Sequence, residues 1–192
     1  MREGASPLWL LALAVIPAVA LASVVKDVGH SHWTDEYDPL FRKYTKHYFG
    51  PHVDWRWFKA QGIAESGLNA DAQSPAGAVG IMQILPSTYA EIKESNPHFV
   101  NIRQPRWNIA AAIYYDRMLY RKWQEGFPAN ERLKLAFASY NAGLGNVLRA
   151  FRRARERQRE GEVRLWSEVA PYAPTETRAY VVRIQRLMIP QG

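Results

Sequence analysis

AESGLNADAQSPAGAVGIMQILPST, residues 64–88, is the segment from which the rest of the chain can be interpreted. It places one glutamate, Glu65, at the end of an apolar segment and follows it with a loop rich in glycine and proline. Asp54 and Gly67 are residue types that begin and end helices, and apolar side chains recur at helical spacing between them. We therefore predict a helix over residues 55–66 that carries Glu65 on its apolar face.

A carboxyl group on an apolar face has a definite chemical consequence. Loss of hydration disfavours the charged form, so the pKa of Glu65 is expected to rise. A carboxyl that is protonated near neutral pH can act as a general acid, and as a base once it has given up its proton. A lone glutamate at a helix end is more often an ordinary solvated residue, so the loop that follows must distinguish the two interpretations.

The loop and three later segments supply that distinction. A tight turn with Ser74, Gly77 and Gly80 leads into a short apolar run that contains one amide, Gln83. The whole segment resembles the active-site signature of the soluble-type lytic transglycosylases, lysozyme-superfamily members that cleave the glycan strands of peptidoglycan. Further segments match that family in the same order: NIAAAIYY (108–115), AFASYNAGLGNV (136–147) and ETRAYVVRI (176–184). The chain departs from the family at Ala112, where glycine is usual, so helix packing there is expected to be slightly wider.

The resemblance implies a mainly α, lysozyme-like fold and a single acid/base, Glu65. In that family the glutamate cleaves the β-1,4 bond between N-acetylmuramic acid and N-acetylglucosamine without water, leaves a 1,6-anhydro end, and requires no cofactor and no metal. The residues expected by the same resemblance to bind the saccharide or to support its cleft are Ser74, Met82, Gln83, Tyr140, Asn141 and Glu176.

Three of these positions also have a purely structural explanation. Tyr140 ends a predicted buried stripe and could be a core residue, and Asn141 could cap a helix. Glu176 shares a predicted helical face with Tyr180 and could simply favour the first turn of its helix.

The number of carboxyl groups bears on the reaction. Most glycosidases need two, and only Glu65 is a clear candidate, since the place of Asp71 in the loop cannot be judged from the sequence. One group suffices when the C6 hydroxyl of the sugar acts as nucleophile, as the resemblance implies. Two alternatives remain open at this point: a goose-type-lysozyme-like hydrolase that uses Glu65 with a bound water, and a non-catalytic glycan-binding component of an envelope machine.

The first 25 residues have the features of a targeting segment. An uncharged run follows a basic residue, and small side chains near Ala22 suit cleavage by a signal peptidase after that residue. The alternative is an uncleaved membrane anchor over residues 8–25, which is close to the shortest span. Both alternatives place the folded part outside the cytoplasm, in the periplasm or cell envelope. We assign residues 26–34 to a linker, and residues 35–192 to one lysozyme-like domain.

The composition fits this assignment. The chain of 192 residues has 25 Lys and Arg against 18 Asp and Glu, a net charge of +7 that favours an anionic partner such as peptidoglycan with its peptide carboxylates. Arginines crowd a predicted helix after Leu144, which would bury Leu148 and Phe151, but no aromatic residues for base stacking alternate with them, so we expect no nucleic-acid partner. The absence of cysteine excludes disulfides and thiolate metal sites. We expect a monomer.

Helical periodicity predicts further helices over residues 35–49, 87–94, 107–123 and 131–140, and a last helix that begins at Thr175.

Overall fold

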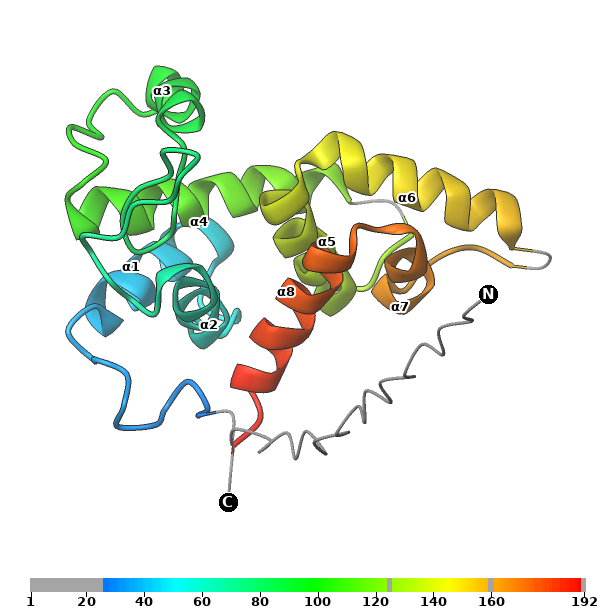
Figure 1. Cartoon of the computed structure of the whole chain (residues 1–192), viewed down its shortest axis with the longest axis horizontal. Coiled ribbons are helices and arrows are strands. Elements are labelled where there is room, and N and C mark those ends of the chain that lie inside the picture. Colours follow the sequence, from blue (N-terminus) through cyan, green and yellow to red (C-terminus); the bar gives the residue numbers. More distant parts are fainter. Residues whose placement is uncertain (1–25, 124–125, 159–160, 191–192) are drawn as a thin grey trace, which may run out of the picture.

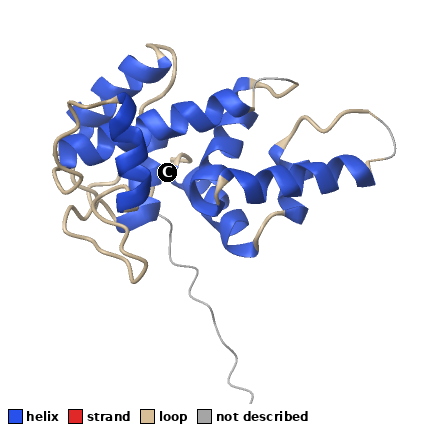
Figure 2. Cartoon of the chain, turned by 90° about the horizontal axis from the view of Figure 1, so that it is seen from above, coloured by secondary structure: helices blue, strands red, loops and turns tan. Residues whose placement is uncertain are grey.

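The computed structural model describes residues 26–123, 126–158 and 161–190. Within these ranges helices are joined by loops, and no strand is formed (Figure 2). The first four helices are α1 (Asp38–Phe49), α2 (Arg56–Ser66), α3 (Pro86–Ser95) and α4 (Pro105–Lys122). They are followed by α5 (Ala129–Ala142), α6 (Leu144–Arg157), α7 (Trp166–Val169), the 3-10 helix η1 (Ala170–Tyr172) and α8 (Thr175–Leu187). The mainly α fold class predicted from the sequence is confirmed.

The helix ends follow local chemistry. Proline stands in the first turn of α3 and α4, where its fixed φ suits a helix and its missing N–H costs no hydrogen bond. Asp54 accepts a hydrogen bond from the backbone N–H of Arg56 (3.0 Å) at the start of α2. Gly67 ends that helix in the left-handed conformation and donates its N–H to the carbonyl of Ile63 (2.9 Å). The predicted extent of α2 is therefore correct to within one residue.

The helices form two groups that meet in the middle of the molecule. Figure 1 shows α1 to α4 on one side, α6 and α7 on the other, and α5 and α8 between them. α4 packs against α1 and α5, while α8 packs against α2 and α5. Phe58 on α2, Phe137 on α5 and Ile184 on α8 are almost completely buried at these contacts. The C-terminal end of α2 is thus brought next to elements that follow it by many residues in the chain.

The loop between α2 and α3 is held on α4 by one buried amide. Asn108 accepts the N–H of Met82 (2.8 Å) and donates to the carbonyls of Val79 and Ile102 (both 3.0 Å). Glycine is required at position 80, because its φ is +76° and a Cβ there would lie 2.6 Å from the Asn108 side chain. The loop therefore has a defined shape although it contains no regular secondary structure.

The segment at residues 26–34, expected to be a linker, contacts the folded part. Val28 is buried, and its N–H donates to the carbonyl of Leu187 (2.7 Å) at the end of α8. The predicted signal or anchor at residues 1–25 lies outside the described residues. Among the residues that are described, no helix is both long enough and apolar enough to cross a membrane.

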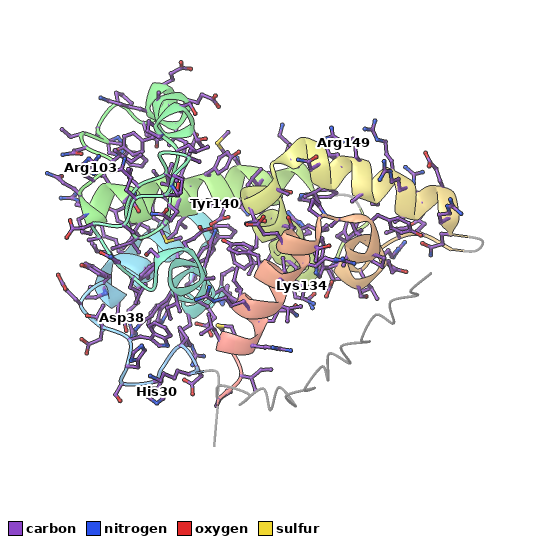
Figure 3. The ribbon with its side chains drawn as sticks, in the orientation of Figure 1. His30, Asp38, Arg103, Lys134, Tyr140 and Arg149 are labelled. Carbon is purple, nitrogen blue, oxygen red and sulfur yellow. The ribbon has the colours of Figure 1, made fainter. Side chains whose placement is uncertain are left out.

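The buried face of α6 matches the predicted one only in part. Val147, Ala150 and Ala154 are buried, whereas Leu148 is 37% exposed. The small side chains of the two alanines allow α6 to approach its neighbours α5 and η1 closely, which turns Leu148 toward solvent. The arginines of α6 that the structure describes are all exposed, and Arg149 projects from the outer surface in Figure 3.

Candidate active site

Glu65 lies one residue before the end of α2 and is half-buried rather than extended into open solvent. Its Oε1 accepts a hydrogen bond from the hydroxyl of Tyr180 on α8 at 2.5 Å. This contact exists because α8 packs along α2, although 115 residues separate the two side chains in sequence.

The surroundings of Glu65 change its acidity. Burial raises the pKa of Glu65 from its ordinary value of 4.5 to about 7. The hydrogen bond from Tyr180 and the positive charge of Arg183 act in the opposite direction, since both stabilise the ionised carboxylate. A carboxyl group with this pKa is present in both forms at neutral pH, so it can donate a proton and later accept one.

Arg183 also stabilises the end of the helix that carries Glu65. Its guanidinium donates to the carbonyls of Ala64 (3.2 Å) and Ile63 (3.4 Å). Carbonyls in the last turn of a helix lack partners within the helix and carry partial negative charge, so a cation there is favourable. The same side chain thus fixes the end of α2 and lowers the pKa of Glu65.

Tyr140 lies on the other side of the site, where the two groups of helices meet (Figure 3). Its hydroxyl donates to the backbone carbonyl of Met82 (2.8 Å), which joins α5 to the loop. Burial and the nearby charge of Glu65 raise the pKa of Tyr140 well above 10.0, so the phenol stays protonated. Tyr115 packs edge-on against Tyr140 with ring centroids 5.6 Å apart. The phenols of Tyr140 on α5 and Tyr180 on α8 therefore both interact with the carboxyl of Glu65, and Tyr115 on α4 packs against Tyr140.

Gln83 and Ser74, which are predicted to bind the saccharide, form hydrogen bonds within the loop between α2 and α3. Gln83 has a φ of +46°, which is uncommon for a residue with a side chain, and its amide donates to the carbonyls of Gly80 (2.9 Å) and Ala72 (3.2 Å). The hydroxyl of Ser74 accepts the N–H of Ala78 (3.0 Å). Both side chains are half-buried, so each remains partly accessible to a ligand.

With this geometry established, comparison with known proteins identifies the family. A family model described as the transglycosylase SLT domain matches residues 40–162. The chain belongs to this family.

Curated relatives of this SLT domain protein carry the name lytic murein transglycosylase. The membrane-bound lytic murein transglycosylase F of Haemophilus influenzae is 33% identical over 117 residues, which cover 61% of this chain and 22% of the relative. The protein of the same name from Vibrio vulnificus is 31% identical over 136 residues, 71% of this chain and 23% of the relative. The chain thus spans less than a quarter of the length of these curated relatives.

Solved structures match the fold. The 70-kDa soluble lytic transglycosylase of Escherichia coli superposes with a TM-score of 0.64 at 25% identity, covering 81% of this chain and 24% of that one. A complex of the 70-kDa soluble lytic transglycosylase with bulgecin A gives a TM-score of 0.57 at 26% identity, covering 78% of this chain and 23% of that one. The lysozyme-like fold expected from the sequence is confirmed.

Met82 is buried in the SLT domain, whereas Asn141 lies on its surface. The side chain of Met82 is fully buried, because Gly62 on α2 leaves room for its sulfur, and the residue reaches the site through its backbone carbonyl. Asn141 is exposed and accepts a hydrogen bond from the hydroxyl of Thr177 (2.8 Å). Since α5 continues to Ala142, Asn141 does not cap that helix.

Glu176 and Asp71 are both exposed, and neither forms a hydrogen bond with Glu65. Glu176 is exposed in the first turn of α8, and the buried face of that helix is formed by Thr177, Tyr180 and the residues that follow at helical spacing. Asp71 is also exposed, and its N–H donates to the side chain of Asn69. A role for Glu176 in supporting the site remains a prediction from the resemblance.

Sequence reasoning missed two partners of Glu65. Tyr180 and Arg183 both lie inside the matched segment at 176–184, but the sequence pattern gives Tyr180 only a shared helical face and does not distinguish Arg183 from other surface arginines. Periodicity could have placed Tyr180 on the buried side of α8, but it could not show which helix that side meets. Among the described residues, no cluster of three or more metal-binding side chains is formed, so no metal ligands can be named.

Proposed function

We propose that this SLT domain is a peptidoglycan lytic transglycosylase in which Glu65 is the general acid and then the general base. The observation on which the proposal rests is the pKa of about 7 of a half-buried carboxyl that accepts a hydrogen bond from Tyr180. The relatives named lytic murein transglycosylase support the choice of substrate, since murein is peptidoglycan.

The reaction proceeds in two proton transfers. Protonated Glu65 donates to the bridging oxygen of the β-1,4 bond, and the bond from that oxygen to C1 of N-acetylmuramic acid breaks. Ionised Glu65 then accepts the proton of the muramic C6 hydroxyl as O6 bonds to C1, which forms the 1,6-anhydro ring and consumes no water. Tyr180 stabilises the carboxylate between the two steps, because its hydrogen bond favours the ionised form.

The placement of the other carboxyl groups supports this reaction over a two-carboxylate hydrolysis. A two-carboxylate mechanism needs a second group that contacts the sugar or a water. The carboxyl in the described part of the chain whose pKa responds to Glu65 is Asp116, and it is fully buried. A single acid/base at the site therefore argues against a two-carboxylate hydrolysis, and product analysis distinguishes the proposed reaction from hydrolysis by Glu65 with a bound water.

We further infer that the protein acts in the cell envelope, since its substrate lies outside the cytoplasm and relatives are named membrane-bound. Residues 1–25 would direct export. N-terminal sequencing of the protein recovered from the envelope fraction tests this: a chain beginning after Ala22 supports a cleaved signal, an intact N-terminus supports an anchor, and recovery only from the cytoplasm contradicts export.

Product analysis tests the reaction. Purified sacculi digested with the protein should release fragments with 1,6-anhydro ends, identified by mass spectrometry. Reducing ends would instead indicate a hydrolase. Glu65→Gln should slow release by about 10²-fold or more, while sedimentation with sacculi is retained. Glu156→Gln on the exposed face of α6 is the matched control and should cleave normally. Unchanged cleavage by Glu65→Gln would exclude the enzymatic role of this residue.

A further inference from the structure

A buried polar pair behind Glu65 has no part in the reaction described so far. Gln61 lies on α2, four residues before Glu65, so the two side chains share one face of the helix. Asp116 lies on α4, and both Gln61 and Asp116 are completely buried. The amide Nε2 of Gln61 donates to Oδ1 of Asp116 at 3.4 Å.

The hydrogen bonds of this pair are incomplete if Asp116 is ionised. Oδ2 of Asp116 and Oε1 of Gln61 are both buried without a partner. An ionised carboxylate offers only acceptors, and an amide oxygen is also an acceptor, so neither atom can satisfy the other. One proton on Asp116 removes the conflict, since Oδ2 then donates to Oε1 while Nε2 donates to Oδ1.

The surroundings of Asp116 favour the neutral form. The ion pairs recorded for the described residues involve other carboxyl groups. The titratable groups that interact with Asp116 are Glu65 on α2, Tyr140 on α5, Tyr180 on α8 and Tyr115 on α4, and none of them is a cation. Burial raises the pKa of Asp116 well above its ordinary value of 3.8. The hydrogen bond from Gln61 lowers it by less, and the negative charge of Glu65 raises it.

We propose that Asp116 is a positioning residue for Glu65, that it works as a neutral carboxylic acid, and that its two hydrogen bonds with Gln61 hold α2 on α4 one turn behind Glu65. This inference rests on the proposed function of Glu65. Neutrality matters for the reaction: an ionised Asp116 would repel the charge on Glu65 and hinder its ionisation in the first proton transfer.

Asp116→Asn tests the protonation state, because a carboxamide can form the same two hydrogen bonds as a neutral acid. At neutral pH the variant should unfold at a urea concentration no lower than that of wild type, because wild-type Asp116 must take up a proton on folding and the amide need not. It should cleave sacculi within about twofold of the wild-type rate. The alkaline limb of the pH–rate profile, set by Glu65, should not move. A shift of that limb to lower pH would overturn the proposal, since it would mean that the substitution had removed a negative charge.

Glu131→Gln is the matched control. Glu131 is a buried carboxyl that forms an ion pair with Lys134 (2.5 Å) and accepts the N–H of Trp166 (2.8 Å). At neutral pH the same acid-to-amide change should therefore lower the unfolding midpoint at Glu131 but not at Asp116. Equal losses at both positions would contradict a neutral Asp116.

Asp116→Leu tests whether the pair positions Glu65. It leaves the Gln61 amide buried without a partner, so both the unfolding midpoint and the cleavage rate should fall. Adding Gln61→Leu removes the unpaired amide and should restore the midpoint but not the wild-type cleavage rate. An Asp116→Leu variant as stable and as active as wild type would show that the pair has no such role.

Infrared spectroscopy supplies a readout that does not depend on activity. In Glu65→Gln at about pH 8, where exposed carboxyl groups are ionised, the carbonyl stretch of a protonated carboxyl should persist and should disappear on adding Asp116→Asn. Absence of that band in Glu65→Gln would refute the neutral acid. Because no cleavage is measured, the band tests Asp116 even if the proposed reaction is wrong.

Discussion

At the scale of single residues, the acidity of Glu65 is set by opposing contributions. Burial raises its pKa, whereas Tyr180 and Arg183 lower it. The result, about 7, leaves the group able to work in both protonation states. Burial alone would raise the pKa still further, so the hydrogen bond from Tyr180 limits the rise.

Tyr180→Phe should therefore raise the pKa of Glu65 further, because it removes a donor that stabilises the carboxylate. The alkaline limb of the pH–rate profile should move to higher pH, and the maximal rate should fall. Initial rates of sacculus cleavage measured across the pH range check this. Tyr89→Phe is the control. Tyr89 lies on α3, and its hydroxyl is buried and has no hydrogen-bond partner among the described residues. A limb that moves to lower pH in Tyr180→Phe would contradict the assigned role.

At the scale of elements, the loop between α2 and α3 depends on close backbone contact with α4. Prolines, helix-ending glycines and apolar periodicity allowed the helices to be predicted except for the short α7 and η1, and the observed ends of the others lie within a few residues of the predicted ones. The path of the loop could not be predicted, because it depends on a buried amide, Asn108, that follows the loop by more than twenty residues.

Alanine substitutions at two glycines in this loop distinguish the destabilisation caused by backbone strain from that caused by steric overlap. Gly77 and Gly80 both have positive φ, but a Cβ at 77 meets nothing within 4 Å, whereas one at 80 lies 2.6 Å from Asn108. Gly77→Ala should destabilise the fold by about 1 kcal/mol from strain alone, and Gly80→Ala by roughly 3 kcal/mol. Urea unfolding measures both. Equal losses would show that the contact with Asn108 does not limit position 80.

At the scale of the whole molecule, the raised pKa of Glu65 makes stability depend on pH. The unfolded chain loses this proton near 4.5 and the folded protein near 7. Between those values the folded state binds more protons, so stability falls as pH rises. The buried acid Asp116, whose pKa is also raised, acts in the same direction.

Replacing Glu65 by Gln should remove its share of this dependence. The free energy of unfolding of wild type relative to Glu65→Gln should decrease by up to roughly 3 kcal/mol between about pH 4 and pH 8. Urea unfolding at a series of pH values measures the difference, with Glu156→Gln on the surface of α6 as the control that shows no such trend. An increase of the difference with pH would contradict the raised pKa.

The sequence by itself determined the helical class, the family and the position of Glu65 at the end of an apolar helix. These properties are local: they depend on periodicity, on helix-ending residues and on short segments that can be compared directly. Only the tertiary structure decided which side chains surround Glu65. Tyr180 is 115 residues away along the chain, and Asp116 is 55 residues from its partner Gln61. Periodicity tells which side of its own helix a residue occupies, but packing between helices determines what that side meets.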